Sequence, residues 1–271
     1  MFDLFGGISR HEKRSLVLRA ALVIVGLVAL VGAVGFLLNW PPVARLWPFL
    51  GYGLVPVFLA SIMAAIAAPV IWIGVSGELA ALRGGAANLL VTGGGIAAYA
   101  LLQSWGDPVG RVQMFASVML AAAMVAFLLL VAAQRIEWRD SRPTPPIVRV
   151  AFGIFGLGLA AVSTGLVLRQ DVFPWRLDSD TSVVYGIIFL GSAVYFAYGL
   201  YRPVWGNAKG QLVGFLAYDL VLIVPFARLW TAAPSLSLAV YLVVIGASAL
   251  LAIWYLLASP TYRLWSKPEG A

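Results

Sequence analysis

One acidic side chain in this sequence, Asp219, stands in the middle of a long apolar segment, 211–230. A charged Asp at the centre of a membrane helix costs about 2.5–3.5 kcal/mol on insertion scales. We therefore expect Asp219 to face the protein interior, beside Tyr218, and to bond either Tyr198 or a Ser or Thr of a neighbouring helix. Two roles fit such a residue: carrying a proton or cation, or making a structural hydrogen bond.

Few other residues are of the kinds that catalyse reactions or hold cofactors. The chain has no cysteine and one histidine, His11, which excludes thiolate metal sites, cysteine nucleophiles and a haem held by two histidines. The run Gly93-Gly94-Gly95 lacks the lysine and the strand of a phosphate-binding loop. An intramembrane aspartyl enzyme needs a second buried carboxylate, and the predicted spans contain no second one close to Asp219. We expect no catalytic residue, no metal and no cofactor, and interpret the protein as a non-enzyme.

Composition indicates a membrane protein. The chain is 62% hydrophobic and 11% charged, whereas soluble domains carry roughly 25% charged residues. Runs of about 20 apolar residues recur, and each can cross a hydrocarbon core of roughly 30 Å. Such spans must be helical, because lipid offers no partner for free backbone N–H and C=O groups. We predict an all-α polytopic bundle of eight transmembrane helices, at 17–38, 54–76, 86–104, 113–133, 148–168, 183–201, 211–230 and 236–258.

The eight predicted helices form two similar sets of four. Six residues recur at the same spacing in the first and fifth spans: Arg19, Ala21, Ile24, Gly26, Leu27 and Gly35 against Arg149, Ala151, Ile154, Gly156, Leu157 and Gly165. Later echoes are Trp47-Pro48-Phe49 against Phe173-Pro174-Trp175, and Gly74, Gly85 and Trp105 against Gly199, Gly210 and Trp230. Four spans are an even number, so both sets enter the membrane in the same orientation, which predicts two parallel pseudo-repeats.

The two sets differ most where Gly93-Gly94-Gly95 in one faces Tyr218-Asp219-Leu220 in the other. Three glycines weaken a helix by roughly 1 kcal/mol each, and in membranes they let another helix approach closely. Because Gly94 is the counterpart of Asp219, we expect the glycines to lie beside Asp219 and make room for it. A broken helix that lines a site is the alternative, and plain close packing of the glycines against a neighbouring helix is the interpretation that we favour.

Charge distribution predicts the orientation. With both termini on one side, the 18 Lys and Arg residues divide 13 to that side and 5 to the other, and basic loops stay in the cytoplasm. We predict that both termini are cytoplasmic and that the membrane is a bacterial inner membrane. The net charge of +7 is then explained by insertion and by anionic lipid headgroups, and no nucleic-acid partner is expected. Glu78, in a predicted turn, is expected to reach interface water.

These predictions divide the chain into an N-terminal segment (1–16), a first repeat (17–134), a polar, proline-rich linker (135–147), a second repeat (148–258) and a tail (259–271). For function we predict an accessory or structural membrane subunit, bound to lipid and to a protein partner or a second copy. The alternative is a permease for a small solute or ion that uses Asp219. The candidate polar site comprises Asp219, Tyr218, Tyr198 and Gly94.

Overall fold

The computed structural model describes residues 10–49, 53–104 and 110–265. Eight helices in this part are long and apolar enough to cross a membrane, which confirms the predicted helical class and makes the chain an integral membrane protein. These helices are α1 (Arg10–Leu37), α3 (Val55–Ser76), α4 (Leu82–Gln103), α5 (Arg111–Ala133), α6 (Pro146–Val167), α7 (Ser179–Tyr201), α8 (Trp205–Ala232) and α9 (Leu236–Ile253). Shorter elements are α2 (Pro41–Ala44), the 3₁₀ turn Leu79–Ala81 and the π turn Trp254–Ala258.

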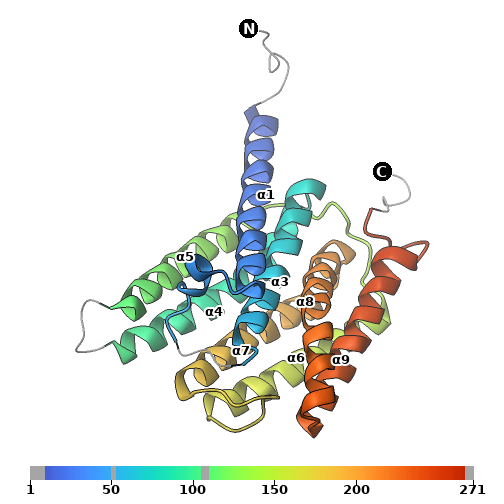
Figure 1. The fold of residues 1–271 in the computed structure, drawn as a ribbon. Coiled ribbons are helices and arrows are strands. Elements are labelled where there is room, and N and C mark those ends of the chain that lie inside the picture. Colours follow the sequence, from blue (N-terminus) through green and yellow to red (C-terminus); the bar gives the residue numbers. More distant parts are fainter. Residues whose placement is uncertain (1–9, 50–52, 105–109, 266–271) are drawn as a thin grey trace.

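The spans run alternately up and down, so α1 begins and α9 ends at the same end of the bundle (Figure 1). We call this the termini end; α4, α6 and α8 also begin there. At the opposite end lie α2, the segment 168–178 between α6 and α7, and the turn between α8 and α9.

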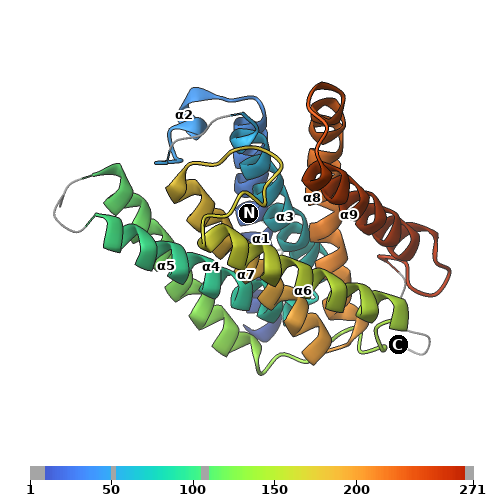
Figure 2. The ribbon, with the colours of Figure 1, turned by 90° about the horizontal axis from the view of Figure 1, so that it is seen from below.

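Helix packing follows a paired scheme. Each of α1, α5, α6 and α9 lies along one inner helix, respectively α3, α4, α7 and α8. The inner helices then join crosswise, α3 with α8 and α4 with α7, while the consecutive helices α3 and α4 barely touch. As a result α5 and α9 lie at opposite edges of the molecule (Figures 1 and 2).

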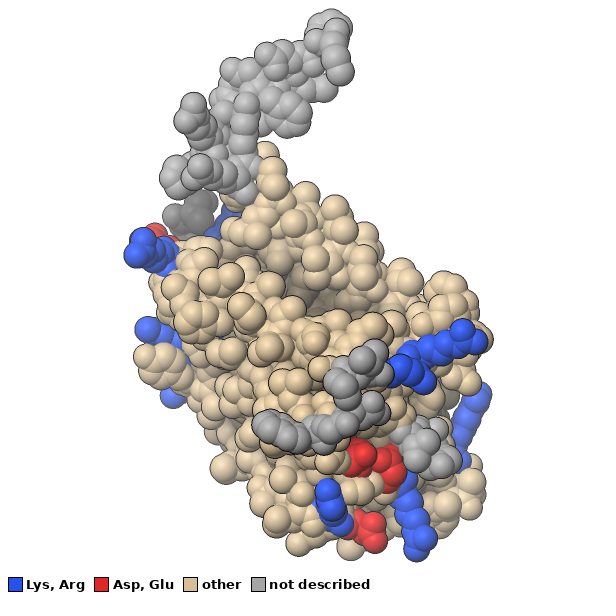
Figure 3. All heavy atoms as spheres, turned by 90° about the vertical axis from the view of Figure 1, so that its left-hand side faces the viewer, with Lys and Arg blue, Asp and Glu red and all other residues tan. Residues whose placement is uncertain are grey.

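The four outer helices present apolar side chains outward. Val28, Leu128, Leu157 and Leu250 are all largely exposed, as expected of surfaces that face lipid rather than water. On the face seen in Figure 3, charged side chains of the described residues lie at the margins and the lower end, and the described residues of the upper middle are uncharged.

An aromatic core fills the inside near the opposite end. Phe58 of α3 and Tyr185 of α7 meet with ring centroids 4.4 Å apart. The turns that carry Trp47 and Phe173 fold over this pair, with ring centroids 6.2 Å from Tyr185 and 5.2 Å from Phe58 respectively. Large rings at these distances add contact area and favourable edge-to-face geometry, so they hold α3 and α7 together where the backbones lie apart.

Several predicted spans began too late, among them the third and the seventh. The hydropathy pattern placed the third and seventh spans at 86–104 and 211–230, whereas α4 and α8 begin at Leu82 and Trp205. The first turns of these helices contain Arg83 and Lys209, which lower local hydropathy, yet both side chains are buried. Trp105, matched above to Trp230, lies outside the described residues.

Close contact between α1 and α3 generates a testable prediction. A Cβ atom at Gly74 would lie 2.8 Å from the Arg19 carbonyl oxygen, so Gly74→Ala should push the helices apart and destabilise the protein by about 1–3 kcal/mol. Gly85→Ala is the control, because a Cβ there meets no atom within 4 Å. Thermal unfolding in detergent should show a lower midpoint for the first variant only; equal midpoints would contradict this packing.

Candidate functional site

Asp219 is buried in the contact between α8 and α9, with 1% of its surface exposed. Its Oδ2 accepts a hydrogen bond from the Ser248 hydroxyl of α9, which also lies 3.1 Å from the Ile245 carbonyl oxygen. Its Oδ1 has no hydrogen-bond partner among the described residues. Of the partners expected for Asp219, the structure therefore supplies the serine on a neighbouring helix.

A second polar contact joins the same two helices. The hydroxyl oxygens of Tyr218 and Tyr241 are 2.5 Å apart, and the Tyr218 ring packs edge-on against Phe58 of α3, at 6.0 Å between centroids. The α8–α9 contact thus contains two polar pairs, one carboxyl–hydroxyl and one hydroxyl–hydroxyl, inside the apolar span.

The other two predicted site residues lie elsewhere. Tyr198 of α7 is close to α4, where a Cβ at Gly84 would lie 3.3 Å from its ring. The nearest atom to a Cβ at Gly94 is Ala123 Cβ of α5, at 4.0 Å. The expectation that the glycine run makes room for Asp219 is wrong, because Gly93 abuts α5 and Gly95 abuts Ile187 of α7.

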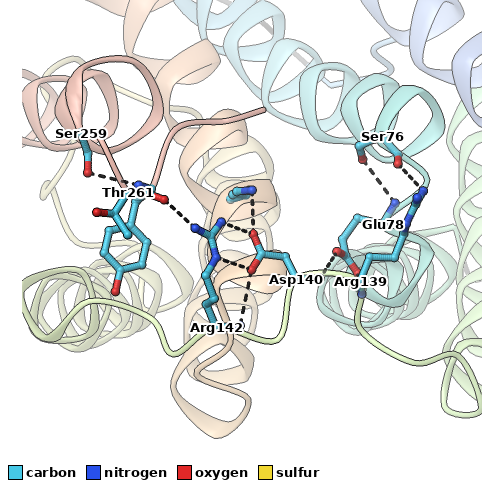
Figure 4. A network of polar contacts seen from close by, with 9 residues as sticks. Ser76, Glu78, Arg139, Asp140, Arg142, Ser259 and Thr261 are labelled. Atoms are coloured by element: carbon cyan, nitrogen blue, oxygen red, sulfur yellow. Dashed lines mark hydrogen bonds and ion pairs between the residues drawn. The ribbon is translucent and has the colours of Figure 1, made fainter. Parts of the chain in front are cut away.

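A buried polar network at the termini end ties the linker to the bundle (Figure 4). Glu78 follows α3, and its two carboxylate oxygens accept hydrogen bonds from the backbone N–H groups of Arg139 and Asp140, at 3.0 and 2.9 Å. Only 3% of Glu78 is exposed, so the expectation that it reaches water is wrong. The two backbone N–H groups of the linker take the place of water as hydrogen-bond donors to its carboxylate.

Asp140 is the centre of this network. Its Oδ2 lies 2.6 Å from Arg142 Nη2 and 2.8 Å from Lys209 Nζ, and both Asp140 and Lys209 are buried. Its carbonyl oxygen accepts the Gly206 N–H at the start of α8, where a negative charge is favoured by the helix dipole. Arg142 also donates to the Thr261 carbonyl oxygen at 2.5 Å, so the network reaches the segment after α9.

The two acids differ in their electrostatics. Burial raises the pKa of the Glu78 carboxyl, and the two amide hydrogen bonds only partly oppose this. Burial also acts to raise the pKa of Asp140, but hydrogen bonds and charges from Arg142 and Lys209 outweigh it and lower that pKa below its ordinary value. Asp140 is therefore held as an anion between two cations.

Three arginines at this end cap helices. Arg19 donates to the carbonyl oxygens of Gly74 and Val75 at the end of α3, and Arg139 donates to that of Ser76. Arg83 donates to the Ala133 carbonyl oxygen at the end of α5. The last carbonyls of a helix lack partners within it, and cations are favoured there.

Sequence reasoning missed this network for a simple reason. Glu78 and Asp140 are 62 residues apart, and Asp140 and Lys209 are 69 apart, so no local pattern connects them. The linker sequence predicts only a polar connection, and its charges bear only on the orientation. A usable signal was the scarcity of acids, 11 in the chain, beside so many basic residues at one end.

Comparisons with protein-family models, with curated proteins and with solved structures find no match to this chain. The function is therefore inferred from the geometry of the site.

Asp140→Asn tests the network. The change leaves Lys209 buried without a counter-charge, and breaking a buried ion pair costs roughly 3–5 kcal/mol. Glu137→Gln is the matched control, because Glu137 is an exposed acid on the same linker. Thermal unfolding in detergent should show a large loss for the first variant and little change for the second.

The pH dependence has a defined sign. Since the pKa of Asp140 is lower in the folded protein, its stabilisation is complete above the unfolded value near 3.8 and is lost as pH falls through the folded value. The Asn variant should lack this acid-dependent loss. An unchanged acid dependence would contradict the assignment.

Proposed function

We propose that this protein is a structural or accessory membrane subunit built from two four-helix repeats. In this proposal Asp219 serves to join α8 and α9. The observation that carries the proposal is the Asp219–Ser248 pair: a residue whose sequence context allows either a functional or a structural role is buried against a serine of the next helix. No catalytic activity is part of this proposal.

Helix bounds support the repeat. Adding 125 to the bounds of α5, 111 and 133, yields 236 and 258, which are the first residue of α9 and the last residue of its π turn. Adding 125 to 76, where α3 ends, yields 201, where α7 ends. The first helices, α1 and α6, end at 37 and 167, which are 130 apart. The difference of five residues falls in the connection after the first helix of each set.

The same turn follows both first helices. Asn39 and Arg169, 130 residues apart, are the two non-glycine residues with positive φ in the described part of the chain, at 50° and 59°. In each case the next residue closes the turn, with the Trp40 N–H donating to the Gly35 carbonyl oxygen and the Gln170 N–H to that of Gly165. The crosswise packing of the inner helices also agrees with a repeat, because the contact between α3 and α8 corresponds to the contact between α7 and α4.

The polar pair itself has a counterpart. Subtracting 125 from 219 and 248 yields 94 and 123, and a Cβ at Gly94 has Ala123 as its nearest neighbour. The same inter-helix contact is thus made by Gly and Ala in the first set and by Asp and Ser in the second. A carboxyl–hydroxyl bond takes the place of close backbone packing, and both are ways in which membrane helices associate.

A permease is the second candidate, and the Tyr218–Tyr241 hydroxyl contact favours it. Together with Asp219 and Ser248 it places four polar side chains in one inter-helix contact. Clustered polar groups within membrane spans are typical of proton or ion pathways. In this function Asp219 would exchange a proton or a cation.

We further propose a bacterial inner membrane with both termini in the cytoplasm, and association with lipid and with a protein partner or a second copy. The positive-inside distribution supports this orientation. Reporter fusions after residue 271 and within the segment 104–110 should report opposite sides of the membrane, cytoplasmic for the first. Reports from the same side would contradict the eight-span topology.

Variants of the polar pair separate the two functions. Ser248→Ala leaves the buried Asp219 carboxyl without its partner, which should destabilise the protein by about 1–3 kcal/mol. The double variant Asp219→Gly, Ser248→Ala installs the pair of the first set and should recover most of that loss. Thermal unfolding in detergent measures both.

Transport is measured with the same protein in proteoliposomes that contain a pH-sensitive dye. A structural role predicts equal proton flux for the wild type and for Asp219→Asn, which preserves hydrogen bonding. A flux that is present in the wild type and abolished in a folded Asn variant would overturn the structural role and establish the permease.

A further inference from the structure

A cavity of about 230 Å³ opens at the end opposite the termini, between the end of α6, the segment 168–178 and the start of α7. Its floor contains the buried residues Leu166, Phe173 and Ser182, and its rim carries Arg169 and Asp171, both exposed. Since each molecule of liquid water occupies about 30 Å³, this space suits a small polar group rather than a whole lipid.

Arg169 occupies an unusual position on this rim. Its φ of 59° is a left-handed conformation that Asn adopts far more readily than Arg, and Asn39 stands at the matching turn after α1. An Arg at such a position carries a conformational cost that Asn would largely avoid, and it places a guanidinium on the cavity rim. The Tyr99 hydroxyl lies close enough to interact with Arg169, and a guanidinium has five N–H donors for further partners.

Complementary groups surround the cavity. Asp171 brings a negative charge two residues from the positive charge of Arg169. Trp175 and Phe173, with ring centroids 4.5 Å apart, form an aromatic wall, which is favourable for an ammonium group. The indole Nε1 of Trp175 is buried without a hydrogen-bond partner among the described residues. The matching turn after α1 reads Asn39-Trp40-Pro41 and carries neither charge.

We propose that this cavity binds a zwitterionic phosphate–ammonium group, as in the headgroup of phosphatidylethanolamine. Arg169 binds the phosphate, for which a guanidinium supplies paired donors, and Asp171 with the aromatic wall binds the ammonium. The position at the end of the spans is the level at which headgroups lie. This site is independent of Asp219, which lies on α8 and bonds Ser248 of α9.

Native mass spectrometry of the full-length protein released from nanodiscs tests the site. The nanodiscs contain equal amounts of phosphatidylethanolamine and phosphatidylglycerol. Wild type should retain phosphatidylethanolamine preferentially, and Arg169→Asn should reduce its retention about tenfold, the effect of losing one charge-assisted hydrogen bond. Arg169→Asn suits the turn, because Asn39 has the same conformation after α1. Arg176→Asn is the matched control, since Arg176 is an exposed arginine of the same segment outside the cavity lining.

A second variant and a soluble competitor complete the test. Asp171→Asn should reduce the preference for phosphatidylethanolamine over phosphatidylglycerol. Binding of the lipid phosphate by Arg169 should remain unchanged in this variant. If free phosphoethanolamine displaces the bound lipid, the site binds the free group as well as the lipid. If the lipid is retained in the presence of free phosphoethanolamine, the lipid is the ligand. Equal retention of both lipids by the wild type, or unchanged retention in a folded Arg169→Asn variant, would overturn the proposal.

Discussion

Polar groups inside the hydrocarbon are costly unless they find partners within the protein, and the rest of this structure depends on that constraint. It makes all eight spans helical. It also explains why Asp219 lies against Ser248 and why Tyr218 meets Tyr241. These polar pairs lie in a contact between helices, while α1, α5, α6 and α9 turn apolar side chains outward.

The two ends of the bundle are held by different forces. At the termini end, Asp140 bridges Arg142 and Lys209, and arginines cap the ends of α3 and α5. At the opposite end, rings around Phe58 and Tyr185 fill the space between α3 and α7. Charges gather where water is near, and ion pairs buried there are strong only when fully partnered. The aromatic end relies on contact area and shape.

Exchange of partners between inner helices joins the two halves into one body. Because α3 packs on α8 and α4 on α7, neither half of the chain completes its own inner surface. The linker network reinforces this arrangement, since Glu78 and Lys209 come from opposite halves and both bond linker residues. Mid-membrane, the Asp219–Ser248 bond secures the outer helix α9 to α8, as close packing secures α5 to α4.

The sequence by itself determined the class of protein, the number of spans, and that the first helix begins and the last helix ends at the same end of the bundle. It also determined that Asp219 is buried against a hydroxyl of a neighbouring helix. These properties follow from hydropathy and from the cost of a carboxyl in lipid, which are local to each segment. Only the tertiary structure decided that Ser248 rather than Tyr198 is the partner, that the glycines pack on α5 and α7, and that Glu78 is buried. These outcomes depend on which helices pair across 29 or more residues of sequence, and a single sequence contains no local pattern that specifies such pairing.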